Sequence, residues 1–233
     1  MKAHIIPASF YGKGLLCSVP PLVFTSDGRP PIRSHRSFYD QSIVTKEGEK
    51  YFGRGDDYAY KLLAEKKGNF SPFKFGDYIS GQKIEHYDYD TLKLFFLSLL
   101  WRSSITKLDA FKRIDLGQHE EQVRKMILER NPGDPEQYSV CLCSFVEPIA
   151  HQGTMLFPYL QRHESLNFYV FSLRGYAALI KMDSRKTPMP FNFLQLSPDR
   201  PLYIVERSIR GTPQMHIINR VMNENRMNLP DWW

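Results

Sequence analysis

The chain has 233 residues, of which 42% are hydrophobic and 24% are charged. This composition is ordinary for a folded globular protein, and the sequence contains no internal repeat and no low-complexity tract. The formal net charge of +6 permits binding to nucleic acid but does not by itself demonstrate it. The length suits one large domain, or a small module fused to a larger one.

The three cysteines are Cys17, Cys141 and Cys143. An odd number without framework spacing argues against a disulfide-stapled secreted domain, and we expect Cys141 and Cys143 to be small buried side chains. No apolar stretch of signal-peptide length precedes Gly12. The longest apolar run, from Leu92 to Trp101, is too short to cross a bilayer. We therefore expect a cytoplasmic protein that does not contact membranes.

The first part of the chain predicts a small module of loop, hairpin and helix. Residues 12–37 are rich in Pro, Gly and Ser and indicate a loop. Residues 42–45 and 49–52 are expected to pair as a hairpin, with the "KEGE" segment as its turn. Residues 56–68 predict a helix that Asp56 or Asp57 caps and Gly68 ends.

The middle of the chain contains the strongest helical signal. Residues 69–89 are aromatic and extended, without a clear period. Residues 90–106 predict a helix that is apolar on most sides, with Asp90 as its N-cap, and we expect it to be the central buried helix. A second helix is predicted over residues 118–130, and the "NPGDP" segment ends it.

The last part of the chain alternates strand signals. Residues 138–147 and 201–207 each predict one strand, whereas residues 167–182 predict either two strands around Arg174 or one long bent strand. A final helix is predicted over residues 213–225, with a proline in its first turn.

These elements predict an α+β fold with a small N-terminal ββα-like module, a helical middle and a β-rich C-terminal region. We divide the chain into a module of residues 1–68 and an α+β body of residues 69–233. Architecture alone does not assign a function, because one fold can carry many activities.

The stretch "AHIIPAS" presents one histidine inside an apolar run. His4 precedes Ile5, Ile6 and Pro7, and such a run would hold the imidazole rigidly. That suits a general base, whose neutral ring must be aimed at a water molecule. The alternative is a structural histidine that hydrogen-bonds to the backbone, and for a lone histidine this is the commoner case.

A set of ordered motifs gives a more specific signal over residues 3–130. The segments "AHIIPASFYG", "SFYDQSIV", "FGRGDDYAYKLL", "LKLFFLSLLWRSSI" and "LGQHEEQVRKMIL" occur in this order. In order and spacing they resemble a family of bacterial HNH-endonuclease-like proteins. The resemblance implies a ββα-metal, treble-clef-like module and metal-dependent hydrolysis of phosphodiester bonds. It further implies a role in bacterial defence against foreign DNA.

The resemblance assigns roles to three residues. His4 matches the general base, and Asp40 and Asp56 match acidic positions of the site, where Mg²⁺ or Mn²⁺ would bind. The sequence departs from the family at its C-x-x-C-E segment, because residues 45–49 read "TKEGE". Both cysteines of that segment are absent, and only Met1, Lys2 and Ala3 precede the histidine motif, where members of the family often carry a further C-x-x-C. A four-thiolate site therefore cannot form in this module, and we expect no structural zinc.

Basic residues cluster in the loop beside the predicted module. Arg29, Arg33 and Arg36 would contact phosphates if the protein binds DNA or RNA, and a plain solvated loop is the alternative. Two functions therefore stay open. The retained His4, Asp40 and Asp56 favour a nuclease-like protein, whereas the missing cysteines favour a non-catalytic assembly subunit that binds nucleic acid or protein.

Overall fold

One long helix, α2 (Tyr89–Ile105), lies at the centre of the molecule. It confirms the helix predicted over residues 90–106. Its N-cap is Asp88 rather than Asp90, because the Asp88 carboxylate accepts a hydrogen bond from the backbone N–H of Thr91 at 2.9 Å. The fully buried apolar side chains of α2 are Leu92, Phe95, Phe96, Leu97, Leu99 and Leu100.

The computed structural model describes residues 3–11, 21–25, 28–34, 37–147, 154–163, 165–173 and 175–227. Its helices and strands confirm the α+β fold. The largest sheet has seven strands in the order β5-β6-β12-β7-β11-β10-β9. In that order they are β5 (Phe70–Phe75), β6 (Ile79–Ile84), β12 (Leu202–Arg207), β7 (Val140–Phe145), β11 (Tyr176–Lys181), β10 (Leu166–Leu173) and β9 (Tyr159–His163). Only β12 and β7 are parallel neighbours; the other pairs are antiparallel.

The sheet is buried on both faces. Along β7, Val140 and Leu142 join a hydrophobic cluster with α2, whereas Cys141 and Cys143 point to a second cluster on the opposite face. This alternation follows from the period of two in a strand. Both thiols are buried as expected, and burial raises the pKa of Cys141 to about 12. Cys17 lies outside the described residues.

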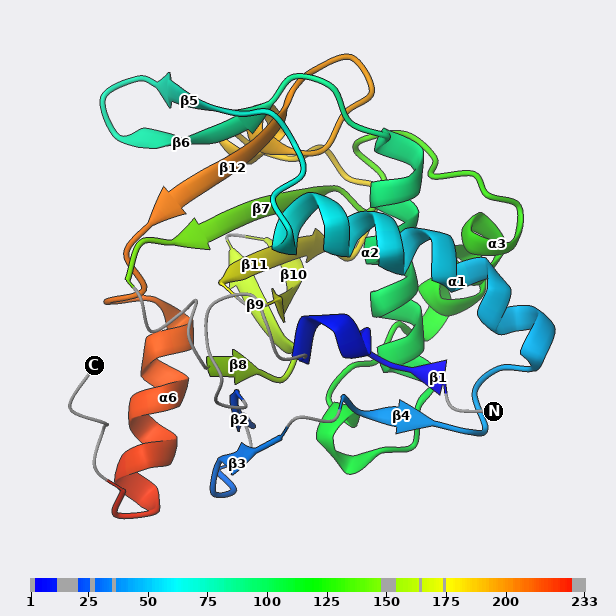
Figure 1. The fold of residues 1–233 in the computed structure, drawn as a ribbon, viewed down its shortest axis with the longest axis vertical. Helices are drawn as coiled ribbons and strands as arrows, with labels where there is room; N and C mark the ends of the chain where they lie inside the picture. Colours follow the sequence, from blue (N-terminus) through cyan, green and yellow to red (C-terminus); the bar gives the residue numbers. More distant parts are fainter. Residues whose placement is uncertain are drawn as a thin grey trace.

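The second face of the sheet is covered by short elements from separate parts of the chain. They are α5 (Phe191–Leu194), α6 (Pro213–Glu224), β2 (Leu22–Phe24) and β8 (Thr154–Leu156). The strand β2 pairs in parallel with β8 and antiparallel with β3 (Ile32–Arg33), forming a separate three-stranded sheet. The helix α6 confirms the predicted last helix, and in Figure 1 it lies at the lower left of the molecule.

The segment predicted as a hairpin over residues 42–52 is helical instead, and that prediction is wrong. Helix α1 (Lys46–Ala59) begins after Thr45, whose hydroxyl accepts a hydrogen bond from the Gly48 N–H at 3.2 Å. Acidic residues in the first turn also favour a helix start. The helix continues as the π-helix η2 (Tyr60–Ala64), so Asp56 lies inside the helix rather than at its cap.

The N-terminal segment packs on the same core as the body. Strand β1 (Ala3–His4) pairs antiparallel with β4 (Tyr39–Asp40), and the turn η1 (Ala8–Tyr11) follows β1. The ring of Phe10 stacks on that of Phe95 with 6.1 Å between centroids. One hydrophobic cluster therefore contains residues from both sides of the domain boundary predicted at residue 68. The division of the chain into two separately folding domains stays a prediction.

The remaining sequence predictions differ in outcome. Residues 167–182 form two strands, and the helix predicted over 118–130 is α3 (Glu120–Leu128), preceded by the 3-10 turn η4 (Gly117–His119). A further 3-10 turn is η3 (Asp109–Phe111). In Figure 1, α1 and α2 cross to the right of the sheet, and α3 lies beyond them. Among the described helices, none combines the length and apolar character needed to span a membrane.

The hairpin of β5 and β6 was not predicted as strands. Position 81 of this hairpin requires glycine, because a Cβ atom there would lie 2.1 Å from the carbonyl oxygen of Ile204 on the neighbouring strand β12. Even an alanine would therefore push β6 away from β12. Residue Pro72 lies on β5, which is an edge strand, where a missing N–H is tolerated.

We expect the core to depend on α2. Replacing Leu99 or Phe95 by alanine should lower the free energy of unfolding by about 2–5 kcal/mol, because each side chain is at most 1% exposed and would leave a cavity. Urea denaturation followed by circular dichroism measures this loss. The control is Leu128→Ala on α3, whose side chain is 42% exposed and should cost under about 0.5 kcal/mol. Similar midpoints for all variants would contradict the central position of α2.

Candidate functional site

His4 is held at the end of β1. Its Nδ1 atom is hydrogen-bonded to the hydroxyl of the buried Ser37, and its ring meets the ring of Tyr39 edge-on with 6.2 Å between centroids. The backbone continues the pairing, since the Ile5 N–H donates to the Phe38 carbonyl at 2.9 Å. The imidazole is half-buried and therefore has a defined orientation.

A buried arginine on α2 joins this strand to α1. The Arg102 side chain is only 2% exposed. Its Nη1 atom donates to the His4 carbonyl at 2.7 Å and to Asp56 Oδ2 at 3.1 Å, and its Nη2 atom donates to Asp56 Oδ1 at 2.8 Å. The Ser98 hydroxyl and carbonyl accept the remaining two N–H groups at 3.0 and 3.2 Å. All five donors of the guanidinium group are therefore paired.

Asp56 is committed to this contact. Both of its carboxylate oxygens accept hydrogen bonds from Arg102, and the pair has the bidentate geometry that makes arginine–carboxylate bonds strong. The neighbouring Asp57 behaves differently. It is exposed and pairs with Lys61, one turn later on the helix surface, at 2.6 Å. Asp56 therefore has a structural role that its neighbour does not share.

Asp40 is engaged by two hydroxyl groups. Its Oδ1 atom accepts from the Ser42 hydroxyl at 2.6 Å and from the Ser42 N–H at 2.8 Å, and its Oδ2 atom accepts from the Thr106 hydroxyl at 2.7 Å. The hydrogen bond from the Ser42 side chain is the main cause that lowers the pKa of Asp40 from 3.8 to about 2. The carboxylate is thus ionised and held at its place on β4.

The end of α2 brings the three predicted catalytic residues to one region. Arg102 contacts His4 and Asp56, and Thr106, the C-cap of the same helix, contacts Asp40. A divalent cation on Asp56 would lie beside the guanidinium charge, which disfavours it. Within the described ranges no group of three or more His, Cys, Asp or Glu side chains is placed to hold a metal ion. The two carboxylates, as they are engaged here, do not fit the Mg²⁺ or Mn²⁺ site that the resemblance implies.

The predicted phosphate-binding arginines lie on another part of the fold. Arg33 is exposed on β3 and belongs to the three-stranded sheet, not to the ladder of β1 and β4. Arg29 is exposed next to Gly28, whose carbonyl accepts a hydrogen bond from Asn225 at the end of α6. Arg36 lies outside the described residues. Arg29 and Arg33 therefore lie beside or on a strand of a different sheet from the one that contains His4.

Two residues of the site were missed by sequence reasoning. Arg102 could have been noticed, because a charged residue inside a helix that is apolar on most sides must be paired when it is buried. Its partners His4 and Asp56 could not have been identified from the sequence, since they lie far from Arg102 along the chain. Ser37 carried no signal, because a lone serine in a loop has no pattern that distinguishes it.

We expect the pair of Arg102 and Asp56 to be essential for stability. Asp56→Ala should cost about 3–5 kcal/mol of unfolding free energy, because it leaves a buried guanidinium group unpaired. Arg102→Met combined with Asp56→Leu should cost less than the sum of the single substitutions, since no unpaired charge remains. Chemical denaturation measures all four values. The matched control is Asp57→Ala, which should cost under about 0.5 kcal/mol; equal losses for Asp56→Ala and Asp57→Ala would contradict the buried pair.

The lowered pKa of Asp40 predicts an acid-dependent contribution to stability. The unfolded chain takes up a proton at Asp40 near pH 3.8, whereas the folded chain does so near pH 2. The contribution of the ionised Asp40 carboxylate to the free energy of unfolding is therefore complete above about pH 5 and declines as the pH falls toward 2. Asp40→Asn lacks this titration, so the stability difference between the wild type and this variant should shrink between pH 6 and pH 3. Urea midpoints at the two pH values test this, and an unchanged difference would contradict it.

Comparison of the chain with protein-family models, with curated proteins and with solved structures finds no match. The proposals that follow therefore rest on the side-chain geometry of the described residues, on the net charge and on the order of the sequence motifs.

Proposed function

We propose that the protein binds nucleic acid without cleaving it, as a subunit that keeps the strand–strand–helix order of an HNH-like module. The observation that carries this proposal is the engagement of the two acidic residues. Asp56 is bound through both oxygens by Arg102, and Asp40 accepts from Ser42 and Thr106. Carboxylates that hold the fold together in this way are poorly suited to hold a catalytic cation.

Charge supports nucleic acid as the binding partner. The net charge is +6, and Arg29 and Arg33 are exposed beside and on the short strand β3. Exposed guanidinium groups bind phosphate oxygens and release counterions from the nucleic acid, so the affinity falls as salt rises. A protein partner is the remaining possibility if nucleic acid does not bind.

A second candidate is the metal-dependent nuclease of bacterial defence that the resemblance implies. Two observations favour it. The strands β1 and β4 pair antiparallel and α1 follows β4, as in a ββα module, although β2 and β3 lie between the two strands in the sequence. The Nδ1 atom of His4 is held by Ser37, as an oriented general base requires. Such an activity would require Asp40 or Asp56 to exchange its protein donors for a metal ion.

Replacement of His4 separates the two candidates. If the ring is structural, His4→Ala leaves the Ser37 hydroxyl without this partner and should cost about 1–3 kcal/mol, which lowers Tm by about 2–10 °C in a chain of this size. If His4 is a general base, the same change should lower the cleavage rate by about 10²–10⁴-fold and leave Tm nearly unchanged. Plasmid and single-stranded DNA cleavage with Mg²⁺ or Mn²⁺, together with Tm, gives both readouts.

The control for this experiment is His216→Ala on α6, because that histidine is exposed and should leave Tm and cleavage unchanged. We expect no cleavage by the wild type, together with DNA binding that weakens with salt. Replacing Arg29, Arg33 and Arg36 with alanine should weaken this binding more than replacing Lys74, Lys112 and Lys125, which changes the net charge equally. Cleavage that depends on His4 would overturn the binding proposal in favour of the nuclease, and absence of DNA and RNA binding would leave a protein partner.

A further inference from the structure

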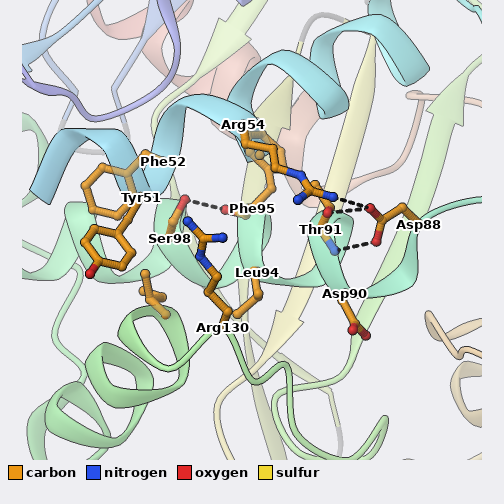
Figure 2. Close-up of a pocket in the computed structure, with 12 residues that line it drawn as sticks. Tyr51, Phe52, Arg54, Asp88, Asp90, Thr91, Leu94, Phe95, Ser98 and Arg130 are labelled. Carbon is orange, nitrogen blue, oxygen red and sulfur yellow. Dashed lines mark hydrogen bonds and ion pairs between the residues drawn. The ribbon is translucent and has the colours of Figure 1, made fainter.

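A pocket of about 230 Å³ lies between α1, α2 and the end of α3. Figure 2 shows its lining, with Phe52 contributed by α1, and Leu94 and Phe95 by α2. Ile127 on α3 adds a further apolar surface. Apolar walls with a few polar groups at the rim are the usual composition of a small-ligand site.

One end of the pocket carries a positive charge. Arg130 lies just beyond α3, and Figure 2 shows its side chain extending toward Ser98 on α2. Its guanidinium carbon lies 5.9 Å from the centre of the Tyr51 ring. Among the ion pairs of the described residues, none involves Arg130. This guanidinium group is therefore available to bind an anion, and the exposed Tyr51 ring beside it offers a surface for a planar group.

The other end of the pocket carries acceptors. Asp90 is exposed in the first turn of α2 and lines the pocket. Beside it, Arg54 pairs with Asp88 at 3.3 Å, and the two side chains are 73% and 38% exposed. An ion pair this exposed contributes little to the stability of the fold, so Arg54 can turn from Asp88 toward an anionic group of a ligand at small cost. The Asp90 carboxylate suits a ligand with hydroxyl or amino donors.

This arrangement selects a class of ligand. Arginine binds phosphate through two parallel N–H groups, and an aromatic ring beside it stacks on a nucleobase. A carboxylate at the opposite end of the pocket accepts hydrogen bonds from ribose hydroxyls or from an exocyclic amine, as in other nucleotide sites. The volume is below the range of sites for drug-sized ligands, which suits one nucleotide unit rather than a larger ligand.

We propose that the pocket between α1, α2 and α3 binds one nucleotide unit, with its phosphate on Arg130, its base against Tyr51 and its donors on Asp90. The unit is either a free nucleoside monophosphate or the terminal nucleotide of a single strand. The site uses none of the basic residues of the loop and strand around β3, so it stands independently of the proposed function.

Calorimetric titration of the full chain tests this assignment. The probes are 5′-AMP, adenosine and inorganic phosphate, and a tetranucleotide with and without a 5′-phosphate. We expect 5′-AMP to bind, and adenosine and phosphate each to bind at least about tenfold more weakly, because each makes only part of the contacts. Tighter binding of the phosphorylated tetranucleotide than of 5′-AMP identifies a strand end as the ligand, and the reverse identifies the free nucleotide.

The variants are chosen to leave the fold intact. Arg130 has a φ of +53°, a conformation that asparagine tolerates, so Arg130→Asn should preserve the end of α3. Tyr51→Leu keeps an apolar helix-forming residue on α1. Each should weaken 5′-AMP binding by about tenfold or more with little change in Tm. The matched control is Arg124→Ala on α3, which is exposed, pairs with Glu121 and does not line the pocket; it should change affinity less than about twofold.

Three results would overturn the assignment. They are no binding of 5′-AMP at millimolar concentration, binding that Arg130→Asn and Tyr51→Leu leave unchanged, and inorganic phosphate binding as tightly as 5′-AMP, which would indicate an anion site only. Replacement of Arg29, Arg33 and Arg36 should leave 5′-AMP binding intact. Absence of long nucleic-acid binding by the wild type, together with 5′-AMP binding, would refute the proposed function and keep the pocket.

Discussion

The five N–H groups of Arg102 hold three separate parts of the chain together. A guanidinium group that is only 2% exposed costs several kcal/mol to bury unless its donors are all paired. Its partners are the carbonyl of His4 on β1, the carboxylate of Asp56 on α1, and Ser98 on α2 itself. The charge can therefore be buried at low cost only when β1 and α1 both lie against the end of α2.

This dependence bears directly on the choice between binding and catalysis. The fold uses the Asp56 oxygens to neutralise Arg102, whereas a metal-dependent site would need them for a cation, and one carboxylate cannot serve both fully. His4 contributes its backbone carbonyl to the same contact, which any residue at position 4 would supply. A substitution at position 4 therefore removes the role of the imidazole ring and leaves that of the backbone carbonyl. The hydrogen bond to Ser37 depends on the ring and is lost with it.

The sequence predicts those parts of the fold in which local pattern and burial agree. The apolar spacing of α2 is such a case, because that helix is buried on most of its sides. The prediction of a hairpin over residues 42–52 is wrong, because a short stretch that mixes polar and apolar residues fits a hairpin or a helix equally well. The N-cap hydrogen bond to Thr45 favours the helix. The motif order identifies His4 and Asp56, but their common contact with Arg102 spans 98 and 46 positions of the chain. No local pattern encodes a pairing at such a separation, because it exists only once the fold brings the segments together.

The buried arginine and the pocket share part of their structure. The guanidinium carbon of Arg102 lies 4.8 Å from the centre of the Phe52 ring, and Phe52 also lines the pocket. Ser98 is shared in the same way, since its hydroxyl accepts from Arg102 and its side chain borders the cavity that Arg130 enters. The wall of the pocket is thus fixed by the same contact that fixes β1. A ligand that depends on the position of this wall binds best to the state in which Arg102 is fully paired, and by thermodynamic linkage it stabilises that pairing in return.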